Sequence, residues 1–73
     1  MLPLTFASEG DWVIVRKVSG AAETKKHLED LGFVVGAEIQ VISSHGGNLI
    51  IKIKDSSLAL VREMASRIMV SAT

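Results

Sequence analysis

Residues 28–39, with the sequence LEDLGFVVGAEI, connect the end of a predicted helix to the start of a predicted strand. The helix runs from about Ala22 to Leu31, and its narrow apolar stripe consists of Ala21, Thr24, Leu28 and Leu31. Gly32 stands where a left-handed residue ends a helix, and Phe33 follows it opposite Leu28, as in a Schellman cap. A helix of about ten residues is not stable alone in water, so we expect its stripe to cover an open end or edge of a sheet.

Short strands separated by glycine- and serine-containing turns account for the rest of the chain. Alternation of apolar and polar side chains is clearest from Leu49 to Lys54, whereas Ile42 breaks the period of the strand before it. Between these two strands, His45–Asn48 is a turn cluster typical of a hairpin. The strands are predicted at 12–18, 38–43, 49–54, 58–61 and 68–70, with a helical turn at 62–66. Short strands with one helix between the first and second long strands favour an all-β fold, a small β-barrel.

The composition excludes several classes of protein. The 73 residues include eight basic and eight acidic side chains, and a net charge of zero argues against a dedicated nucleic-acid binder. Without cysteine there is no disulfide, thiolate metal site or cysteine nucleophile. No apolar run approaches the roughly 20 residues of a membrane-spanning helix, and no secretory signal follows Met1. We therefore expect one soluble, cytoplasmic domain, residues 1–73, with no direct membrane insertion.

Three segments of the chain form a pattern when they are taken together. The first contains Gly10, Asp11, Val13, Val18 and Gly20, the second is residues 28–39, and the third has the pattern LAL…EMA…IMV over residues 58–70. With these segments the chain resembles the FeoA family of ferrous-iron transport accessory proteins. The most specific part is the run Leu-Gly-x-x-x-Gly-x-x-Ile from Leu31 to Ile39. Val35 stands where the family often has proline, and a valine can adopt the same extended conformation.

The resemblance covers the chain from about Leu4 to Val70 and implies an SH3-like barrel. It also implies a non-enzymatic cytoplasmic partner of FeoB, the membrane ferrous-iron transporter with a cytosolic GTPase domain. The same module is found as the C-terminal domain of DtxR-type metal-dependent repressors. Because no helix-turn-helix precedes it here, we expect a free-standing protein.

Catalytic chemistry is not predicted. Ser43, Ser44 and His45 are adjacent, but such polar clusters are typical of turns, and neighbours in a hairpin rarely point at one reactive atom. Gly46 and Gly47 lack the lysine and the strand–loop–helix context of a phosphate-binding loop. We therefore expect that the protein is not an enzyme.

One set of side chains is a candidate for binding a first-row divalent ion such as Fe²⁺. Glu23 and His27 stand at i and i+4 on the predicted helix, and Asp30 would complete an oxygen- and nitrogen-rich trio. The same residues are also typical of an exposed charged helix face, in which Lys26 pairs with Asp30. We expect no resident cofactor, and transient Fe²⁺ binding by a carrier is the open alternative.

A small barrel that binds peptide or RNA, unrelated to iron, is the second alternative. The chain has only two phenylalanines, one tryptophan and no tyrosine, which is few for a proline-rich groove or a base-stacking platform. Trp12 is expected to pack in the core. Lys52 and Lys54 are interpreted as outward-facing strand residues that discourage edge aggregation, so no nucleic-acid partner is predicted.

Apolar side chains at outward positions form the candidate partner-binding surface. They are Ile42, Ile50 and Met69 on predicted strands, and Val34 and Val35 after the helix. We predict that Val34, Val35, Ile50 and Met69 contribute to docking or to self-association, because exposed apolar patches often mark interaction sites. The alternative is that residues 2–6 fold over them. The favoured function is protein–protein contact with the cytosolic region of a FeoB-type transporter.

Overall fold

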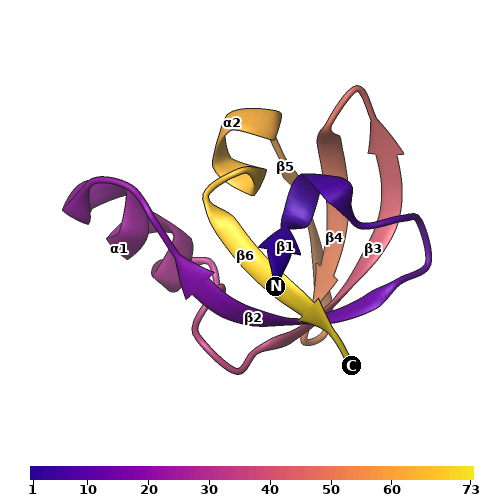
Figure 1. Ribbon diagram of the computed structural model, residues 1–73, viewed down its shortest axis with the longest axis horizontal. Coiled ribbons are helices and arrows are strands. Elements are labelled where there is room, and N and C mark those ends of the chain that lie inside the picture. The colour runs from indigo at the N-terminus through magenta and orange to yellow at the C-terminus, as the bar shows by residue number, and fades with distance from the viewer.

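The computed structural model describes all residues, Met1–Thr73, as one antiparallel six-stranded sheet with three short helical segments (Figure 1). The elements in chain order are β1 (Leu2–Pro3), the 3₁₀ helix η1 (Leu4–Phe6), β2 (Trp12–Val18), α1 (Ala22–Asp30), β3 (Glu38–His45), β4 (Asn48–Ile53), β5 (Ser56–Leu60), α2 (Arg62–Ala65) and β6 (Ile68–Ala72). The prediction of a mostly-β fold with one helix between the first two long strands is confirmed. The predicted helical turn before the last strand is α2.

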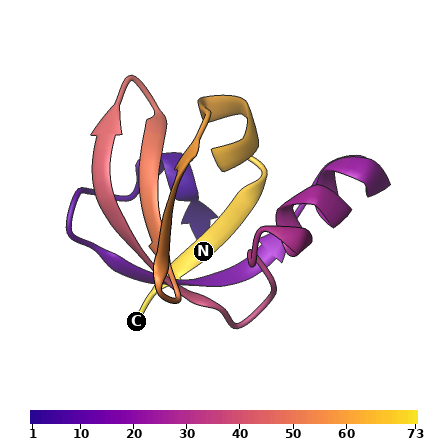
Figure 2. The same ribbon diagram turned by 180° about the vertical axis from the view of Figure 1, so that it is seen from behind.

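The sheet curls around a single core without closing completely, as Figure 1 and Figure 2 show. Neighbouring strands follow the order β1-β6-β2-β3-β4-β5, so β1 and β5 are the two edges and no pairing joins them. The short helices connect the two sides instead, because α2 contacts β4 and η1, and η1 also contacts β6. The architecture is therefore an open barrel.

The core consists of 15 buried side chains, and all of them are apolar. In β4 every second residue from Leu49 to Ile53 is buried, as the period of the sequence predicts. The register between β3 and β4 shifts between Val41 and Ser43, which makes Ile42 the extra, exposed residue of a β-bulge. The bulge is the physical reason why Ile42 breaks the alternation of its strand.

Helix α1 ends in the predicted cap. The Phe33 N–H donates to the Leu28 carbonyl over 3.0 Å. The Gly32 N–H donates to the Glu29 carbonyl over 2.9 Å, which completes the hydrogen-bond pattern of a Schellman motif. Gly32 has a φ of +109°, a conformation that a residue with a Cβ atom rarely adopts. Leu28 and Phe33 are both fully buried in the core, so the cap also attaches the helix to the barrel.

The predicted apolar stripe of α1 is wrong except at Leu28. Ala21 and Leu31 are exposed, and Thr24 is half-buried. Figure 1 and Figure 2 show α1 projecting beyond the end of β2, away from the sheet. The helix is therefore held at its C-terminal end by Leu28 and the cap, and it does not lie along the sheet.

The prediction that Trp12 packs in the core is wrong, because its side chain is 46% exposed. Trp12 begins β2, where Val13 and Val15 are the buried residues. Successive side chains of a strand point to opposite faces, so the burial of these two valines directs Trp12 outward.

The N-terminal segment forms elements that the sequence patterns did not indicate. β1 pairs with β6 and places Pro3 opposite Met69. Leu4 in η1 is fully buried, whereas Phe6 is exposed. The segment therefore extends the sheet and contributes to the core, and it leaves outward residues such as Ile50 exposed.

Candidate functional site

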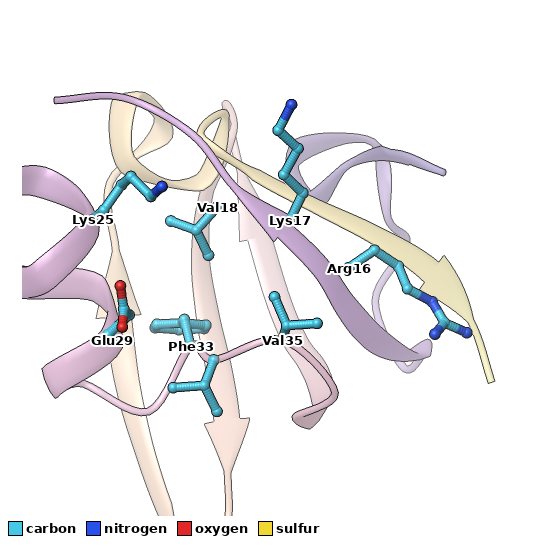
Figure 3. A pocket seen from close by; sticks show the side chains of 8 residues that line it. Arg16, Lys17, Val18, Lys25, Glu29, Phe33 and Val35 are labelled. Carbon is cyan, nitrogen blue, oxygen red and sulfur yellow. The ribbon is translucent and has the colours of Figure 1, made fainter. Parts of the chain in front are cut away.

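A cleft of about 420 Å³ lies between β2, α1 and the segment that follows α1 (Figure 3). Its volume falls within the range of roughly 300–1,000 Å³ that is usual for ligand pockets. The lining residues are Arg16, Lys17, Val18, Lys25, Glu29, Phe33, Val34 and Val35. The cleft therefore combines three cations and one carboxylate with four apolar side chains.

The β2 wall of the cleft depends on a second β-bulge. The register between β2 and β6 shifts between Val15 and Lys17, so Arg16 is the extra residue. Arg16 and Lys17 are consequently both exposed, and the strand returns to the core at Val18. Two neighbouring cations can face solvent here because the bulge interrupts the alternation of the strand.

The α1 wall carries Lys25 and Glu29, which lie one turn apart on the same side of the helix. Figure 3 shows these two side chains across the cleft from Lys17 and Arg16, with Phe33 between the walls. The cations of the cleft therefore come from two elements on opposite sides of an apolar floor.

The floor of the cleft consists of Phe33, Val34 and Val35, and its backbone is held in place at both ends. The Schellman cap fixes Phe33 at one end, as described above. At the other end the Gly36 N–H donates to the Val15 carbonyl over 2.8 Å, and the Val15 N–H donates to the Ala37 carbonyl over 2.9 Å. Between these anchors, Val34 is 45% exposed and Val35 is 69% exposed. The backbone thus presents two apolar side chains to solvent in a fixed position.

The cleft has charged side chains in its walls and apolar side chains in its floor. Its lining contains no serine, cysteine or histidine that could act as a nucleophile with a base. The Arg16 Nε donates to the Ser71 Oγ over 2.7 Å, and Figure 3 shows the charged groups of Arg16 and Lys17 directed away from the apolar floor. Lys25 is therefore the cation directed over the floor, and Lys17 and Arg16 place positive charge at the β2 rim.

The structure brings together two of the four residues predicted to bind a partner. Val34 and Val35 both line the cleft. Ile50 lies on β4, beside a separate apolar hollow of about 250 Å³ that also contains Ala59 and Val61. Met69 is half-buried on β6, and β2 and β3 separate its strand from β4. The predicted residues therefore occupy three places and not one patch.

The predicted metal trio lies on the exposed surface of α1. Glu23, His27 and Asp30 are all exposed. No group of three or more His, Cys, Asp or Glu side chains in the structure is arranged to hold a metal ion. The hypothesis of metal binding by these residues rests on their helical spacing alone.

The polar cluster Ser43–His45 lies at the β3–β4 hairpin, outside the cleft. The Ser44 N–H donates to the Glu9 carboxylate over 2.9 Å, which attaches the loop before β2 to this hairpin. His45 is exposed and stands opposite Asn48 across the turn. The Ser44 backbone therefore joins the hairpin to the loop before β2.

The sequence patterns did not bring the charged walls of the cleft together. They placed Lys25 and Glu29 on the polar side of the helix, and Arg16 and Lys17 on a separate strand. One signal for the cleft was present, because the consecutive charges Arg16 and Lys17, between Val15 and Val18, interrupt the alternation of a regular strand. The approach of α1 to β2 is a tertiary feature that no local pattern contains.

The family model of the FeoA domain matches residues 2–72. The chain belongs to the FeoA family. A protein of Methanocaldococcus jannaschii whose name assigns it to Fe(2+) transport, as transport protein A, is 39% identical over 70 residues. The match covers 96% of this chain and 85% of that relative. The resemblance that residues 28–39 and the C-terminal pattern indicated is thus confirmed.

Solved structures confirm the SH3-like fold of the FeoA family. A crystal structure of an iron uptake regulatory protein (FeoA) superimposes with a TM-score of 0.88 at 30% identity, over 99% of this chain and 96% of that one. A manganese-dependent transcriptional repressor also superimposes with a TM-score of 0.88, over 97% of this chain but only 41% of the repressor. At 18% identity, the repressor shares the fold alone. No helix of this FeoA protein has the length and apolar character needed to cross a membrane.

Proposed function

We propose that this FeoA protein is a non-enzymatic cytoplasmic accessory protein of a FeoB-type ferrous-iron transporter. Membership of the FeoA family supports this function. The M. jannaschii relative is named for Fe(2+) transport, and the superimposed crystal structure is named as an iron uptake regulatory protein. The protein acts by contact with the cytosolic GTPase region of the transporter.

The observation that carries the proposal is the anchored pair Val34 and Val35 in the cleft beside α1. These two exposed apolar side chains lie on a backbone that is hydrogen-bonded at both ends. A preorganised surface loses little conformational entropy when a partner binds. An apolar centre with charged groups around it is also the usual composition of a protein interface.

Ile50 and Met69 lie outside the cleft, on β4 and β6, and Ile50 alone belongs to a second candidate surface within this proposal. They lie on other strands than the cleft, so one partner contact of moderate size is not expected to include all four predicted residues. The apolar hollow beside Ile50 adjoins the edge strand β5, where self-association is the simpler use. The contact with the transporter is assigned to the cleft.

A pair of matched variants tests the assignment. The isolated GTPase domain of the transporter is titrated into wild-type protein, Val35→Asp and Ile50→Asp, and the affinity is measured by calorimetry. Both positions are exposed, so both variants are expected to fold. We expect Val35→Asp to weaken binding at least about tenfold, which corresponds to roughly 1.4 kcal/mol, and Ile50→Asp to bind as wild type.

If Ile50→Asp weakens binding and Val35→Asp does not, the contact lies at the apolar hollow beside Ile50 and not at the cleft. Wild-type affinity for both variants would mean that neither predicted surface binds the GTPase domain. Circular dichroism of each variant confirms that a loss of affinity is not a loss of fold.

A further inference from the structure

We propose that the cleft beside α1 binds an acidic segment of a partner protein, in which a bulky apolar side chain is flanked by carboxylates. The apolar side chain covers Val34 and Val35, and the carboxylates pair with Lys17 and Lys25. This inference rests on the proposed function, because it names the chemistry of the segment that the cleft binds.

The charge of the cleft is unlike that of the whole chain. The protein has eight basic and eight acidic side chains, yet the lining of the cleft has three cations and one carboxylate. Lys25 is directed over the cleft from α1, whereas Lys17 and Arg16 stand at the β2 rim with their charged groups directed away from the floor, and the Arg16 Nε donates to the Ser71 Oγ there. A concentration of one sign in a hollow attracts the opposite charge, so the ligand is anionic.

The floor of the cleft requires an apolar group in the same ligand. Phe33 is fully buried beneath it, and Val34 and Val35 are exposed within it. An anion without an apolar part would leave these valines in water. An apolar segment without carboxylates would desolvate Lys25 and give it no partner, which is unfavourable. The two requirements together define an acidic and apolar segment.

The same features argue against a nucleic acid as the ligand. Bases bind in such clefts by stacking on exposed aromatic rings. Phe33 is the only aromatic residue in the lining, and its side chain is fully buried. The phosphate backbone would meet the two lysines, but the valines would have no partner. A peptide segment supplies both the carboxylates and the apolar side chain.

A substitution of Glu29 is expected to change the affinity for an acidic segment in the opposite direction to a substitution of Lys25. Its carboxylate lies in the α1 wall one turn from Lys25, where it reduces the positive charge of the cleft. Replacement of Glu29 by glutamine removes this negative charge with little change in size. Glu29→Gln is therefore expected to tighten the binding of an acidic segment, whereas Lys25→Glu weakens it.

The test uses three short synthetic peptides and the intact protein. In the first peptide a leucine pair is flanked by glutamates, in the second lysines replace the glutamates, and in the third serines replace the leucines. Binding is measured by NMR titration of the isotopically labelled protein. We expect only the first peptide to shift the amides of Lys17, Lys25 and residues 33–36, with an affinity that falls as salt screens the charges.

A charge-matched pair of variants controls the experiment. Lys25→Glu is expected to weaken binding of the first peptide at least about tenfold. Lys52→Glu makes the same change on the exposed surface of β4, outside the cleft, and is expected to have no effect. Equal binding of the lysine peptide, or no effect of Lys25→Glu, would overturn the inference, as would no binding of the first peptide.

The peptide experiment and the experiment with the GTPase domain can fail independently of each other. If the first peptide fails but the GTPase domain still binds wild-type protein and not Val35→Asp, the contact stands and its acidic character is wrong. If the first peptide binds the cleft but the GTPase domain does not bind, the chemistry of the cleft stands and the transporter contact is wrong.

Discussion

At the β3–β4 hairpin, two neighbouring glycines differ in what a side chain would meet. Gly46 has a φ of +61° and open space around it, whereas Gly47 has a φ of +88° and lies against Arg62. An added Cβ at Gly47 would lie 2.7 Å from the Arg62 Cγ and still closer to its Cδ. A type I′ turn requires positive φ at both central residues, and both glycines have it. The predicted hairpin is therefore confirmed.

Gly47→Ala is therefore expected to destabilise the protein more than Gly46→Ala. The Gly46 variant bears only the cost of a left-handed alanine, about 1 kcal/mol. The Gly47 variant adds a φ farther from the left-handed minimum and the displacement of Arg62, so we expect a loss of about 2–3 kcal/mol. Urea unfolding of both variants measures the free energy of unfolding, and equal losses would contradict the interpretation.

The exposed trio on α1 leads to a prediction about iron. Glu23, His27 and Asp30 are not arranged as a metal site, and a single histidine with surface carboxylates is a weak ligand set for a first-row ion. We expect anaerobic calorimetric titration with Fe²⁺ to show no saturable binding, and His27→Ala to behave as wild type. Saturable micromolar binding that His27→Ala removes would support the carrier alternative.

Among the elements, helix α1 has the weakest attachment to the barrel. It contacts the core through Leu28 and the cap residue Phe33, while its first turns project into solvent. Local opening requires little free energy where few apolar side chains are buried. The α1 wall of the cleft is thus the element most able to adjust to a partner.

Leu28→Ala is expected to release α1 from the barrel. Removal of a buried leucine side chain costs about 2–5 kcal/mol, and here the loss also removes the only buried residue of the helix itself. Leu31→Ala, at the exposed C-cap, is the matched control and is expected to cost less than about 1 kcal/mol.

Hydrogen exchange measures the effect of both variants. The amides of α1 are expected to exchange faster in Leu28→Ala than in the wild-type protein, while the amides of β4 remain the more strongly protected ones. Equal protection of α1 in the two leucine variants would contradict the single-anchor description.

The elements also show how far the sequence can be interpreted. Residues 28–39 predict the end of α1 because the glycine and the following phenylalanine have local roles, and the structure confirms them. The alternation from Leu49 to Lys54 predicts β4 because burial repeats every second residue. Trp12 was misplaced because its burial depends on which face of β2 meets the core, which the neighbouring apolar residues leave open in the sequence.

Interactions between distant segments set the limit of the sequence analysis. β1 has two residues and is defined by its pairing with β6, which lies at the other end of the chain. The cleft forms because α1 leaves β2 at an angle and returns through the capped segment, so its charged walls meet only in the folded protein. Among the residues that line the cleft, the sequence analysis predicted Val34 and Val35 as part of a binding surface. It assigned no such role to the charged residues.

The whole protein is a small open barrel whose core contains no polar side chain. The cleft shares Val18 and Phe33 with this core. Its other lining residues are exposed, on a bulged strand, a projecting helix and a capped segment. Substitutions of the exposed cleft residues are expected to change partner affinity and leave the fold intact.

An NMR titration with the cytosolic GTPase domain of the transporter, with and without a non-hydrolysable GTP analogue, tests whether the cleft binds this domain. We predict saturable chemical-shift changes confined to β2, residues 25–29 of α1 and residues 33–36, which together form the cleft. Dependence on the nucleotide would indicate that the protein regulates the GTPase cycle. Shifts confined to the β4–β5 face, or no shifts at high concentrations of the GTPase domain, would contradict the claim that the cleft binds this domain.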